Sequence, residues 1–327
     1  MVSDLKNRIL SLVKDDLDGI EAALLENLHP NLELVSKVAH HILFSGGKRL
    51  RPLLMVLSAR LCDYRGDYDK TFSVIFEYLH AATLLHDDLV DGADLRRGKP
   101  ASHTVWGNEI AVLVGDFLLA RGLAIAAETN EPRIIKIISE ITENMSQGEI
   151  HQIDRKGKTD LSETEYMDII KCKTAVLFQG ACRISAILAE APEEKEVALA
   201  QYGYHLGMAF QMLDDLLDYT FDTQVLGKTV GADLREGKLT LPVIVALNHA
   251  GPGDRDLMEK IIQNERFTNN DFKWLVEKIS EHGGFEYTRA LAYEHTAKAR
   301  QTLELFPVSP TRDILFDIAG YALERTH

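Results

Sequence analysis

Cysteine is scarce in this chain of 327 residues, where it occurs three times, at Cys62, Cys172 and Cys182. Thiols so few and so scattered exclude a disulfide framework and a zinc cluster. Cys172 and Cys182 lie in one helical pattern at a separation that corresponds to a rise of about 15 Å, which is too far for a disulfide. We therefore expect reduced, buried thiols and a cytosolic protein.

Long apolar runs are also missing. The N-terminal segment carries charges throughout, and no later stretch is continuously apolar over the length that a membrane-spanning helix needs. We therefore expect neither an export signal nor a transmembrane segment, and we place the protein in the cytoplasm.

Basic residues are outnumbered by acidic ones. Lys and Arg total 36 against 50 Asp and Glu, so the formal net charge is −14. A surface of that sign repels nucleic-acid phosphates and anionic lipid, and nucleic acid is excluded as a partner. A small anionic substrate stays compatible if basic residues gather locally or divalent cations screen the acids.

Alternating strand patterns and Gly/Ser-rich or Pro-rich linkers are absent as well, whereas helical periodicity runs from end to end. Apolar residues recur at three- and four-residue spacings in ranges that include 5–24, 71–91, 163–190 and 194–220. The length alone would allow roughly two domains, but nothing separates two halves. The sequence predicts one large all-α domain over residues 1–327.

One acidic pattern occurs twice. Residues 87–91 read Asp-Asp-Leu-Val-Asp and residues 214–218 read Asp-Asp-Leu-Leu-Asp; we call them the first and second acidic motifs. The octapeptide 92–99, Gly-Ala-Asp-Leu-Arg-Arg-Gly-Lys, also recurs at 231–238 with one difference. The distance between motif and octapeptide differs in the two copies, which excludes a fixed-period repeat. The pattern predicts two similar half-sites that face each other.

The acidic motifs indicate a metal site. In a helix Asp87 and Asp91 project from one face, with Asp88 about 100° round the axis. These like charges repel, and Gly92 is placed as the residue that ends the helix, where carboxylates oppose the helix dipole. Oxygen ligands without His or Cys suit Mg²⁺ or Mn²⁺ rather than zinc. The candidate metal ligands are Asp87, Asp88, Asp91, Asp214, Asp215 and Asp218. A solvated acidic surface would explain one such motif better than two.

Basic residues stand where a bound polyanion would need them. Residues 46–52, Gly-Gly-Lys-Arg-Leu-Arg-Pro, predict a flexible turn with Pro52 as the first residue of a helix, whose start attracts anions. The segment is not a Walker loop, because it lacks GxxxxGK[ST]. The other basic residues of this arrangement are Arg96, Arg97, Lys171, Lys173, Lys228 and Lys238. Around two acidic motifs they indicate a site for two diphosphates bridged by Mg²⁺.

From about residue 30 to 325 the chain resembles the trans-polyprenyl diphosphate synthases. The resemblance rests on the two acidic motifs and, in the family's order, on residues 46–52, His80, Arg96-Arg97, Lys173-Thr174-Ala175, Phe210-Gln211 and Gly227-Lys228. It implies an all-α isoprenoid synthase fold with a deep central cavity, a homodimer, and a Mg²⁺ cofactor at about three ions per active site.

The same resemblance implies roles for single residues. Isopentenyl diphosphate would be held by Lys48, Arg51, His80 and Arg97, and the allylic diphosphate by Arg96, Lys173, Lys228 and Lys238. Asp87, Asp91 and Asp214 would be the principal Mg²⁺ ligands, with Asp88, Asp215 and Asp218 adding direct or water-mediated contacts. Beside Lys173, Thr174 and Gln211 would offer oxygen dipoles to an allylic cation. The isopentenyl double bond would attack this cation, and the departing diphosphate would accept the proton.

Two histidines near the first motif need separate interpretation. His80 lies two helical turns before Asp87 and shares its face, although a core histidine would be the default outside this motif. His86 directly precedes Asp87 and raises the alternative of a metal phosphohydrolase of the HD type. Leu213 takes the corresponding place before the second motif. Histidine is therefore not part of the repeated chemistry, which disfavours that alternative.

Small residues precede the first motif, where a product tail would end. Ala82 and Thr83 lie about one turn below Asp87, at positions where the family's farnesyl-length enzymes carry bulky aromatics. Leu79 and Phe76 continue the stripe, with Phe76 about 17 Å below Asp87 as a candidate floor. The small residues of the facing segment 108–128 are Gly115, Ala120, Gly122, Ala124 and Ala126. The sequence of residues 77–99 resembles most the octaprenyl-type enzymes that supply quinone side chains. We therefore expect products of C30 to C50, centrally C40, with C20 as the alternative.

Two rival functions remain open. A terpene cyclase shares the helical architecture and one acidic motif, but its second metal motif is usually different from DDLLD. A non-catalytic regulatory subunit belongs to another class, and it would not need both acidic motifs together with the basic set.

Overall fold

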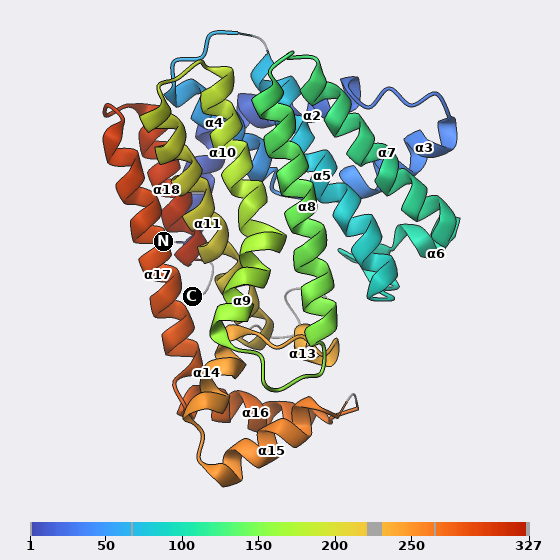
Figure 1. Ribbon diagram of the computed structural model, residues 1–327, viewed down its shortest axis with the longest axis vertical. Helices are drawn as coiled ribbons and strands as arrows, with labels where there is room; N and C mark the ends of the chain where they lie inside the picture. Colours follow the sequence, from blue (N-terminus) through green and yellow to red (C-terminus); the bar gives the residue numbers. More distant parts are fainter. Residues whose placement is uncertain (1, 67, 221–230, 265, 325–327) are drawn as a thin grey trace.

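The computed structural model describes residues 2–66, 68–220, 231–264 and 266–324 (Figure 1). The helices of the first half are α1 (Val2–Leu12), α2 (Lys14–Glu26), α3 (Glu33–Leu43), α4 (Leu50–Leu61), α5 (Tyr68–Val90), α6 (Ser102–Trp106), α7 (Asn108–Ala127) and α8 (Pro132–Arg155). Those of the second half are α9 (Glu163–Ile170), the π-helical segment η1 (Lys171–Ala175), α10 (Val176–Leu188), α11 (Glu193–Thr220), α13 (Ala232–Arg235), α14 (Leu241–His249), α15 (Pro252–Ile262), α16 (Asn269–Glu281), α17 (Gly284–Thr302), the 3-10 turn η2 (Leu303–Leu305) and α18 (Pro310–Glu324). The predicted all-α fold is confirmed.

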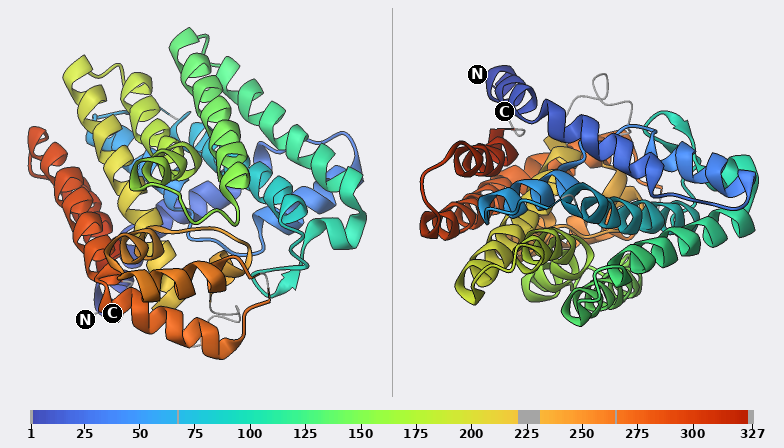
Figure 2. Two further views of the ribbon diagram at one scale, coloured as in Figure 1. Left: turned by 60° about the horizontal axis from the view of Figure 1, so that its bottom comes forward. Right: turned by 90° about the horizontal axis from the view of Figure 1, so that it is seen from above.

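Helix α5 lies inside the helical assembly. It packs against α7, α4, α2 and α10, and the continuous run 72–79 is buried on every side of the helix. A helix that is apolar all round is typical of such a buried position. Helix α10 packs in turn against α11, and α11 against α17, so that these three lie side by side (Figure 2). The helices α14, α15 and α16 form one end of the molecule (Figure 1).

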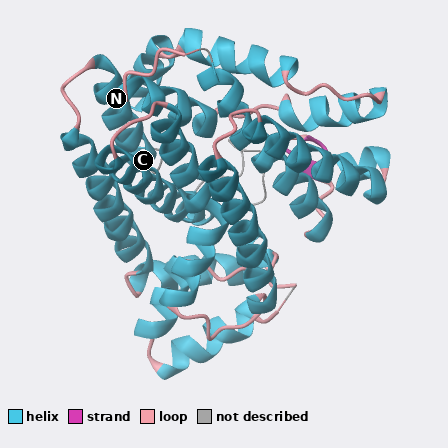
Figure 3. Cartoon of the chain, turned by 45° about the horizontal axis from the view of Figure 1, so that its top comes forward, coloured by secondary structure: helices cyan, strands magenta, loops and turns pink. Residues whose placement is uncertain are grey.

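Helix α5 ends where the first acidic motif ends. Gly92 adopts a φ of +64°, the left-handed conformation that glycine accepts without strain. The backbone N–H of Ala93 donates to the carbonyl of Asp88 at 2.9 Å, which is the closing bond of a Schellman cap. The predicted role of Gly92 is confirmed. The chain then turns through the short antiparallel pair β1 (Leu95–Arg96) and β2 (Lys99–Pro100), the only strands in the described part of the chain (Figure 3).

Two predicted helices are interrupted. The range 5–24 is divided at Val13, whose ψ of 13° bends the chain although Val13 still donates to the carbonyl of Ile9. Asp15 and Asp16 follow in the first turn of α2, where acidic side chains favour a helix start. The range 163–190 is divided by the π-helical segment η1.

Two glycines make room for η1 between its neighbours. A Cβ atom at Gly148 of α8 would lie 2.8 Å from the Cβ of Cys172, and one at Gly207 of α11 would lie 2.7 Å from the Cα of Ala175. Only glycine permits approaches this close. Because η1 carries Lys173 and Thr174, the two glycines hold these side chains between α8 and α11. Single π-helical turns are frequent at functional sites.

One hydrophobic cluster includes buried residues from Ile9 to Leu323. The organisation as a single domain stays a prediction.

All three cysteines are free; Cys62 and Cys182 are buried, whereas Cys172 is only half-buried, so the prediction of buried thiols holds for two of them. Helix α7 is the one described helix long and apolar enough to cross a membrane, and it packs along α5.

A histidine pair joins α11 to α17. The Nδ1 atoms of His205 and His295 lie 3.0 Å apart. Burial, with smaller contributions from His205 and Lys298, lowers the pKa of His295 to about 4, and burial also lowers the pKa of His205. An unfolded histidine binds a proton near pH 6.5, so the unfolded state binds more protons between pH 6.5 and 4. Acid therefore destabilises the fold in this range.

We expect the free energy of unfolding to fall more steeply with acid in the wild type than in His295→Gln. The extra loss between pH 7 and pH 4.5 is about 2 kcal/mol, since the variant has one titrating group fewer. Urea unfolding at both pH values measures it. The matched control is His40→Gln, because His40 is exposed and should leave the slope unchanged. A variant that loses as much stability as the wild type would contradict the prediction.

Candidate active site

The first acidic motif divides its carboxylates between three surroundings. Asp88 is 2% exposed and is held by Arg96, whose Nε lies 2.6 and 2.7 Å from its two oxygens. Burial raises the pKa of Asp87 to about 6, although the Lys173 ammonium opposes this. Asp91 accepts hydrogen bonds from Lys156 at 2.7 Å and from Lys238 at 3.0 Å.

The second acidic motif is organised differently. Asp215 is buried and accepts from the Tyr166 hydroxyl at 2.6 Å and from the Gln211 amide at 2.7 Å. Its pKa is raised to about 7, because burial outweighs these two hydrogen bonds. Asp218 accepts backbone N–H bonds from Ala232 and Asp233 at 3.2 and 3.0 Å, and so fixes the start of α13. Asp214 is exposed.

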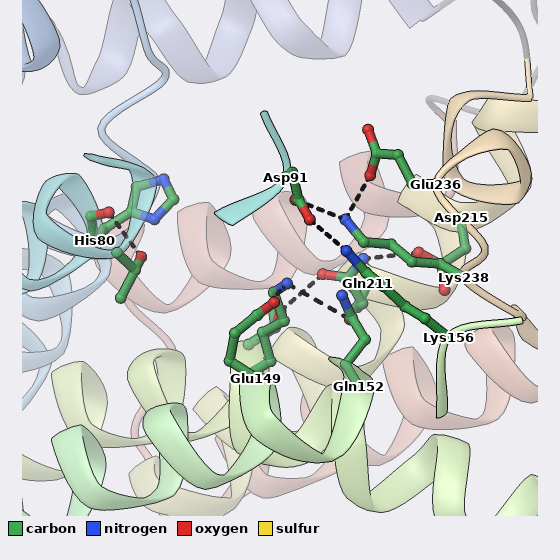
Figure 4. Close-up of polar contacts among 12 residues, drawn as sticks. His80, Asp91, Glu149, Gln152, Lys156, Gln211, Asp215, Glu236 and Lys238 are labelled. Atoms are coloured by element: carbon green, nitrogen blue, oxygen red, sulfur yellow. Dashed lines mark hydrogen bonds and ion pairs between the residues drawn. The ribbon is translucent and has the colours of Figure 1, made fainter. Parts of the chain in front are cut away.

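Several interactions connect the two motifs. Lys238, from the octapeptide that follows the second motif, binds Asp91 of the first motif (Figure 4). Burial lowers the pKa of the Arg51 guanidinium to about 10. The negative charge of Asp214 acts in the opposite direction, so Arg51 lies within electrostatic reach of the second motif. Figure 4 shows Asp91, Gln211 and Asp215 in one region, on elements far apart in sequence. The predicted half-sites therefore share one region. We call the region around Asp91, Gln211, Asp215 and Lys238 the mouth of the site.

A chain of side-chain hydrogen bonds runs under this mouth. Thr174 donates its hydroxyl to Gln211 at 2.7 Å, and Gln211 donates onward to Asp215. Lys173, the neighbour of Thr174, pairs with Glu149 of α8, and its Nζ lies 3.5 Å from the Gln152 carbonyl oxygen. The segment η1 thus presents adjacent residues to α11 and α8.

Arg51, His80, Arg96 and Arg97 gather beside the first motif, and we call them the basic cluster. Burial lowers the pKa of His80 well below its usual value, and the nearby guanidinium groups of Arg51, Arg97, Arg96 and Arg49 lower it further. His80 is therefore a neutral hydrogen-bonding group among cations. A Cβ atom at Gly47 would lie 3.2 Å from Arg97 Nη1, so the absent side chain lets this guanidinium approach the turn. Such a concentration of cations suits a polyanion.

Arg49 anchors the Gly-Gly turn and has no evident role toward a ligand. It is buried at a φ of +49°, and it donates to Glu77 at 2.6 Å, to Glu21 at 2.7 Å and to the carbonyl of Leu43. These bonds fix the start of α4 at Leu50. Pro52 is consequently the third residue of α4 rather than the first, and the predicted position was wrong.

The structure brings most of the predicted site residues together around the mouth and the basic cluster. They are Arg51, His80, Asp87, Asp88, Asp91, Arg96, Arg97, Lys173, Thr174, Gln211, Asp214, Asp215, Asp218 and Lys238. Lys48 precedes α4, with its Nζ 5.7 Å from the centre of the Tyr321 ring. Lys228 lies outside the described residues. Arg96 is assigned to the allylic diphosphate by resemblance, and in this structure it pairs with Asp88. The individual roles stay predictions.

The donors of the mouth fit Mg²⁺. Among the described residues, no three His, Cys, Asp or Glu side chains converge into a preformed metal site. Mg²⁺ typically binds through one or two carboxylates and takes further ligands from substrate phosphates and water. Glu149 Oε1 and Gln152 Nε2 are buried and find no hydrogen-bond partner in the described part of the chain. A ligand or water beside Lys173 would satisfy these atoms.

The chain-length candidates divide over two faces of α5. At 100° per residue, Thr83 lies about 40° from Asp87 round the helix, whereas Ala82 lies about 140° away. Phe76, Leu79 and Ala82 are buried, and Thr83 is half-buried.

The facing helix α7 leaves less room than predicted. A Cβ atom at Gly122 would contact Ile75 and Leu79, and one at Gly115 would collide with the His86 ring. Ala120 and Ala124 are exposed and do not face α5. The prediction that they widen the tail space was therefore wrong.

His86 turns away from the mouth. Its Nε2 lies 3.2 Å from the carbonyl of Val112 and 3.7 Å from Asp116, both on α7. An HD-type metal site would need His86 beside Asp87 at the metal. The geometry removes that alternative.

Sequence reasoning missed five residues of this region: Glu149, Gln152, Lys156, Tyr166 and Asp233. Glu149 and Gln152 stand one helical turn apart in Gly-Glu-Ile-His-Gln, and the preceding Gly148 was a local signal that could have drawn attention to them. Tyr166 and Lys156 carry no motif, because their roles depend on contacts between distant segments.

Comparison with known proteins agrees with this geometry. The polyprenyl synthetase family matches residues 32–279. Octaprenyl diphosphate synthase of Escherichia coli (strain K12) is 38% identical over 318 residues, which cover 97% of this chain and 98% of that protein.

Two solved structures are similar over nearly their whole length. The polyprenyl synthase from Caulobacter crescentus CB15, complexed with calcium and isoprenyl diphosphate, gives a TM-score of 0.92 at 38% identity and 98% coverage of both chains. A decaprenyl diphosphate synthase from Rhodobacter capsulatus gives 0.92 at 35% identity, covering 98% of this chain and 99% of that one. The chain therefore belongs to the polyprenyl synthetase family and is a prenyltransferase.

Proposed function

We propose that this chain extends an allylic diphosphate with isopentenyl diphosphate in successive trans steps to a long-chain polyprenyl diphosphate of C30 to C50, centrally C40. The observation that carries the proposal is the meeting of both acidic motifs at one mouth beside the basic cluster. A single acidic motif could bind a cation, but two motifs and separate cationic groups suit two diphosphates.

The basic residues and His80 bind the two diphosphates, whereas the aspartates are the candidate ligands of Mg²⁺. Arg51, Arg97 and neutral His80 hold isopentenyl diphosphate, while Lys173 and Lys238 lie on the other side of the first motif and hold the allylic diphosphate. The aspartates of both motifs would hold Mg²⁺, which would supply Lewis-acid stabilisation of the leaving diphosphate. Lysine and arginine add fixed positive charge where negative charge grows as the allylic C–O bond breaks.

The remaining steps need little further chemistry from the protein. The Thr174 hydroxyl and the Gln211 carbonyl oxygen lie in one hydrogen-bonded chain, which orients oxygen dipoles toward the mouth. These dipoles stabilise the allylic cation until the isopentenyl double bond attacks it. The departing diphosphate, held by the basic residues, accepts the proton that is then lost.

The long product is supported by a small residue under the mouth. Thr83, on the Asp87 side of α5, leaves the first turn below Asp87 without an aromatic barrier. The similar proteins that act as octaprenyl and decaprenyl diphosphate synthases favour the same range. We propose that the enzyme lies in the cytoplasm and that its product supplies quinone side chains.

Mass analysis of products formed from isopentenyl and farnesyl diphosphates with Mg²⁺ tests the proposal. We expect a C30 to C50 polyprenyl diphosphate. Products that end at C15 or C20 would overturn the long-chain assignment. A cyclised hydrocarbon formed from geranylgeranyl diphosphate alone would indicate a terpene cyclase, and turnover only after a partner chain is added would indicate a regulatory subunit.

We propose that a second copy of the chain covers the outward face of α7. Leu113 and Leu123 are 61% and 38% exposed there, and Ala120, Ala124 and Ala127 complete a mostly apolar stripe that includes one exposed charge, Asp116. An unpartnered apolar stripe of this length marks an interaction site. Two copies of α7 related by a twofold axis would bury it.

Light scattering is expected to give twice the 36.6 kDa of one chain. The double variant Leu113→Asp with Leu123→Asp should give one chain's mass, because two buried charges would face their own copies. Val308→Asp is the control, since Val308 is 80% exposed and lies outside the stripe. A dimer that survives the double variant would contradict this interface.

A further inference from the structure

Two lysines from different loops grip the last carboxylate of the first acidic motif. Lys156 Nζ lies 2.7 Å from Asp91 Oδ1, and Lys238 Nζ lies 3.0 Å from Asp91 Oδ2 (Figure 4). The Asp91 side chain is 12% exposed, and those of Lys156 and Lys238 are 26% and 15% exposed. Pairs this sheltered are screened less than surface ion pairs.

The backbone holds the two lysine loops together. The N–H of Gly157 donates to the carbonyl of Gly237 at 2.9 Å. Gly237 adopts a φ of +75°, and a Cβ atom there would lie 3.2 Å from the nitrogen of Gly157. Lys156 and Lys238 are the residues next to these glycines. The loop after α8 and the turn after α13 therefore form one unit that reaches Asp91.

The two lysines also affect the pKa of the Asp91 carboxyl. Burial acts to raise the pKa of Asp91, but the hydrogen bonds and charges of Lys156 and Lys238 outweigh it and lower the pKa.

A divalent cation at Asp91 would meet two positive charges already bound there. Mg²⁺ needs a carboxylate oxygen at about 2.0 Å, and each Asp91 oxygen already faces an ammonium group. The cation would repel both lysines at that distance. Lysine has a flexible stem and a compact charge, so it can swing to another acceptor. A diphosphate that arrives with the cation brings such acceptors.

We propose that Lys156 is a positioning residue that, with Lys238, clamps Asp91 in the cation-free enzyme and transfers to a diphosphate oxygen when the cation binds. The proposal rests on the proposed function, because it assumes a diphosphate at this mouth. The binding of the cation and the binding of the diphosphate then depend on each other, because the cation displaces Lys156 from Asp91 and the diphosphate accepts it.

Binding of Mn²⁺ without substrate tests the clamp directly. Electron paramagnetic resonance counts the bound Mn²⁺, and the signal that Asp91→Asn abolishes defines the relevant site. Lys156→Gln should bind this Mn²⁺ about tenfold more tightly than the wild type, because one competing charge is gone. Lys156→Arg should bind it more weakly, because a guanidinium grips a carboxylate through two donors.

Lys158→Gln is the matched control. Lys158 lies in the same loop, carries the same charge, and pairs with Asp154 of α8 at 3.1 Å. Its Mn²⁺ affinity should stay within about twofold of the wild type, as for an exposed pair. With Mg²⁺ present, Lys156→Gln should bind inorganic pyrophosphate about tenfold more weakly, because the transferred lysine is missing.

Opposite shifts of the Mn²⁺ and pyrophosphate affinities in Lys156→Gln support the clamp. Unchanged Mn²⁺ affinity, equal effects of Lys156→Gln and Lys158→Gln, or tighter Mn²⁺ binding by Lys156→Arg would overturn it. If Lys156→Gln fails to fold, the arginine variant alone decides by its sign. Prenyl transfer by the wild type is measured separately, so the clamp and the proposed function can fail independently.

Discussion

Replacing Asp87 by alanine is expected to slow isopentenyl transfer about a thousandfold, and Asp214→Ala is expected to cost the same. Both carboxylates belong to the mouth where Lys238 connects the two motifs. Each removal takes away a ligand for the cation that stabilises the leaving diphosphate. Steady-state transfer of labelled isopentenyl diphosphate at saturating Mg²⁺ measures the loss.

The double variant distinguishes one shared site from two separate sites. Residues that act as a unit lose little more together than alone, so Asp87→Ala with Asp214→Ala should remain within about tenfold of the single variants. Independent effects would instead multiply to about a millionfold. Asp154→Ala is the control, because Asp154 is exposed and pairs with Lys158 on α8. Full activity in either single variant would contradict the roles given to the motifs.

Thr83→Phe is expected to shorten the product from the C30 to C50 range to C15 or C20. Thr83 is half-buried on the Asp87 side of α5, and its hydroxyl donates within the helix to the carbonyl of His80 at 2.9 Å. A phenyl ring there would fill the first turn below the mouth, where the growing tail must pass. Mass analysis of the products measures the shift.

Thr83→Val is the matched control, because it keeps the volume and removes only the hydroxyl. Its products should match those of the wild type. Ala82→Phe should also shorten the product, but at a larger loss of stability, since Ala82 is fully buried and overpacking costs about 1–3 kcal/mol. Wild-type products from Thr83→Phe would show that the tail takes another path.

The helices and the two acidic motifs could be predicted because their signals are local. The end of α5 illustrates this: apolar periodicity, the spacing of the aspartates and Gly92 lie within one segment, and the Schellman cap follows from them. The pairing of the half-sites was inferred from the repeated octapeptide, and the Lys238–Asp91 contact agrees with it.

The rest depends on contacts between distant segments. Lys156 meets Asp91 beside the backbone bond between Gly157 and Gly237, and Tyr166 of α9 meets Asp215 of α11. The π-helical turn itself depends on two glycines in other helices, so no periodicity within 163–190 reveals it. The wrong position of Pro52 has the same origin, because buried Arg49 sets the helix start.

Both acidic motifs are expected to hold cations that bind one shared diphosphate. A crystal of the protein with Mn²⁺ and inorganic pyrophosphate tests this most directly, because Mn²⁺ is located by its anomalous scattering. We expect Mn²⁺ bound to Asp87 or Asp91 and further Mn²⁺ bound to Asp214, with the pyrophosphate bridging them. Mn²⁺ at one motif only, or at both motifs without a shared pyrophosphate, would contradict it.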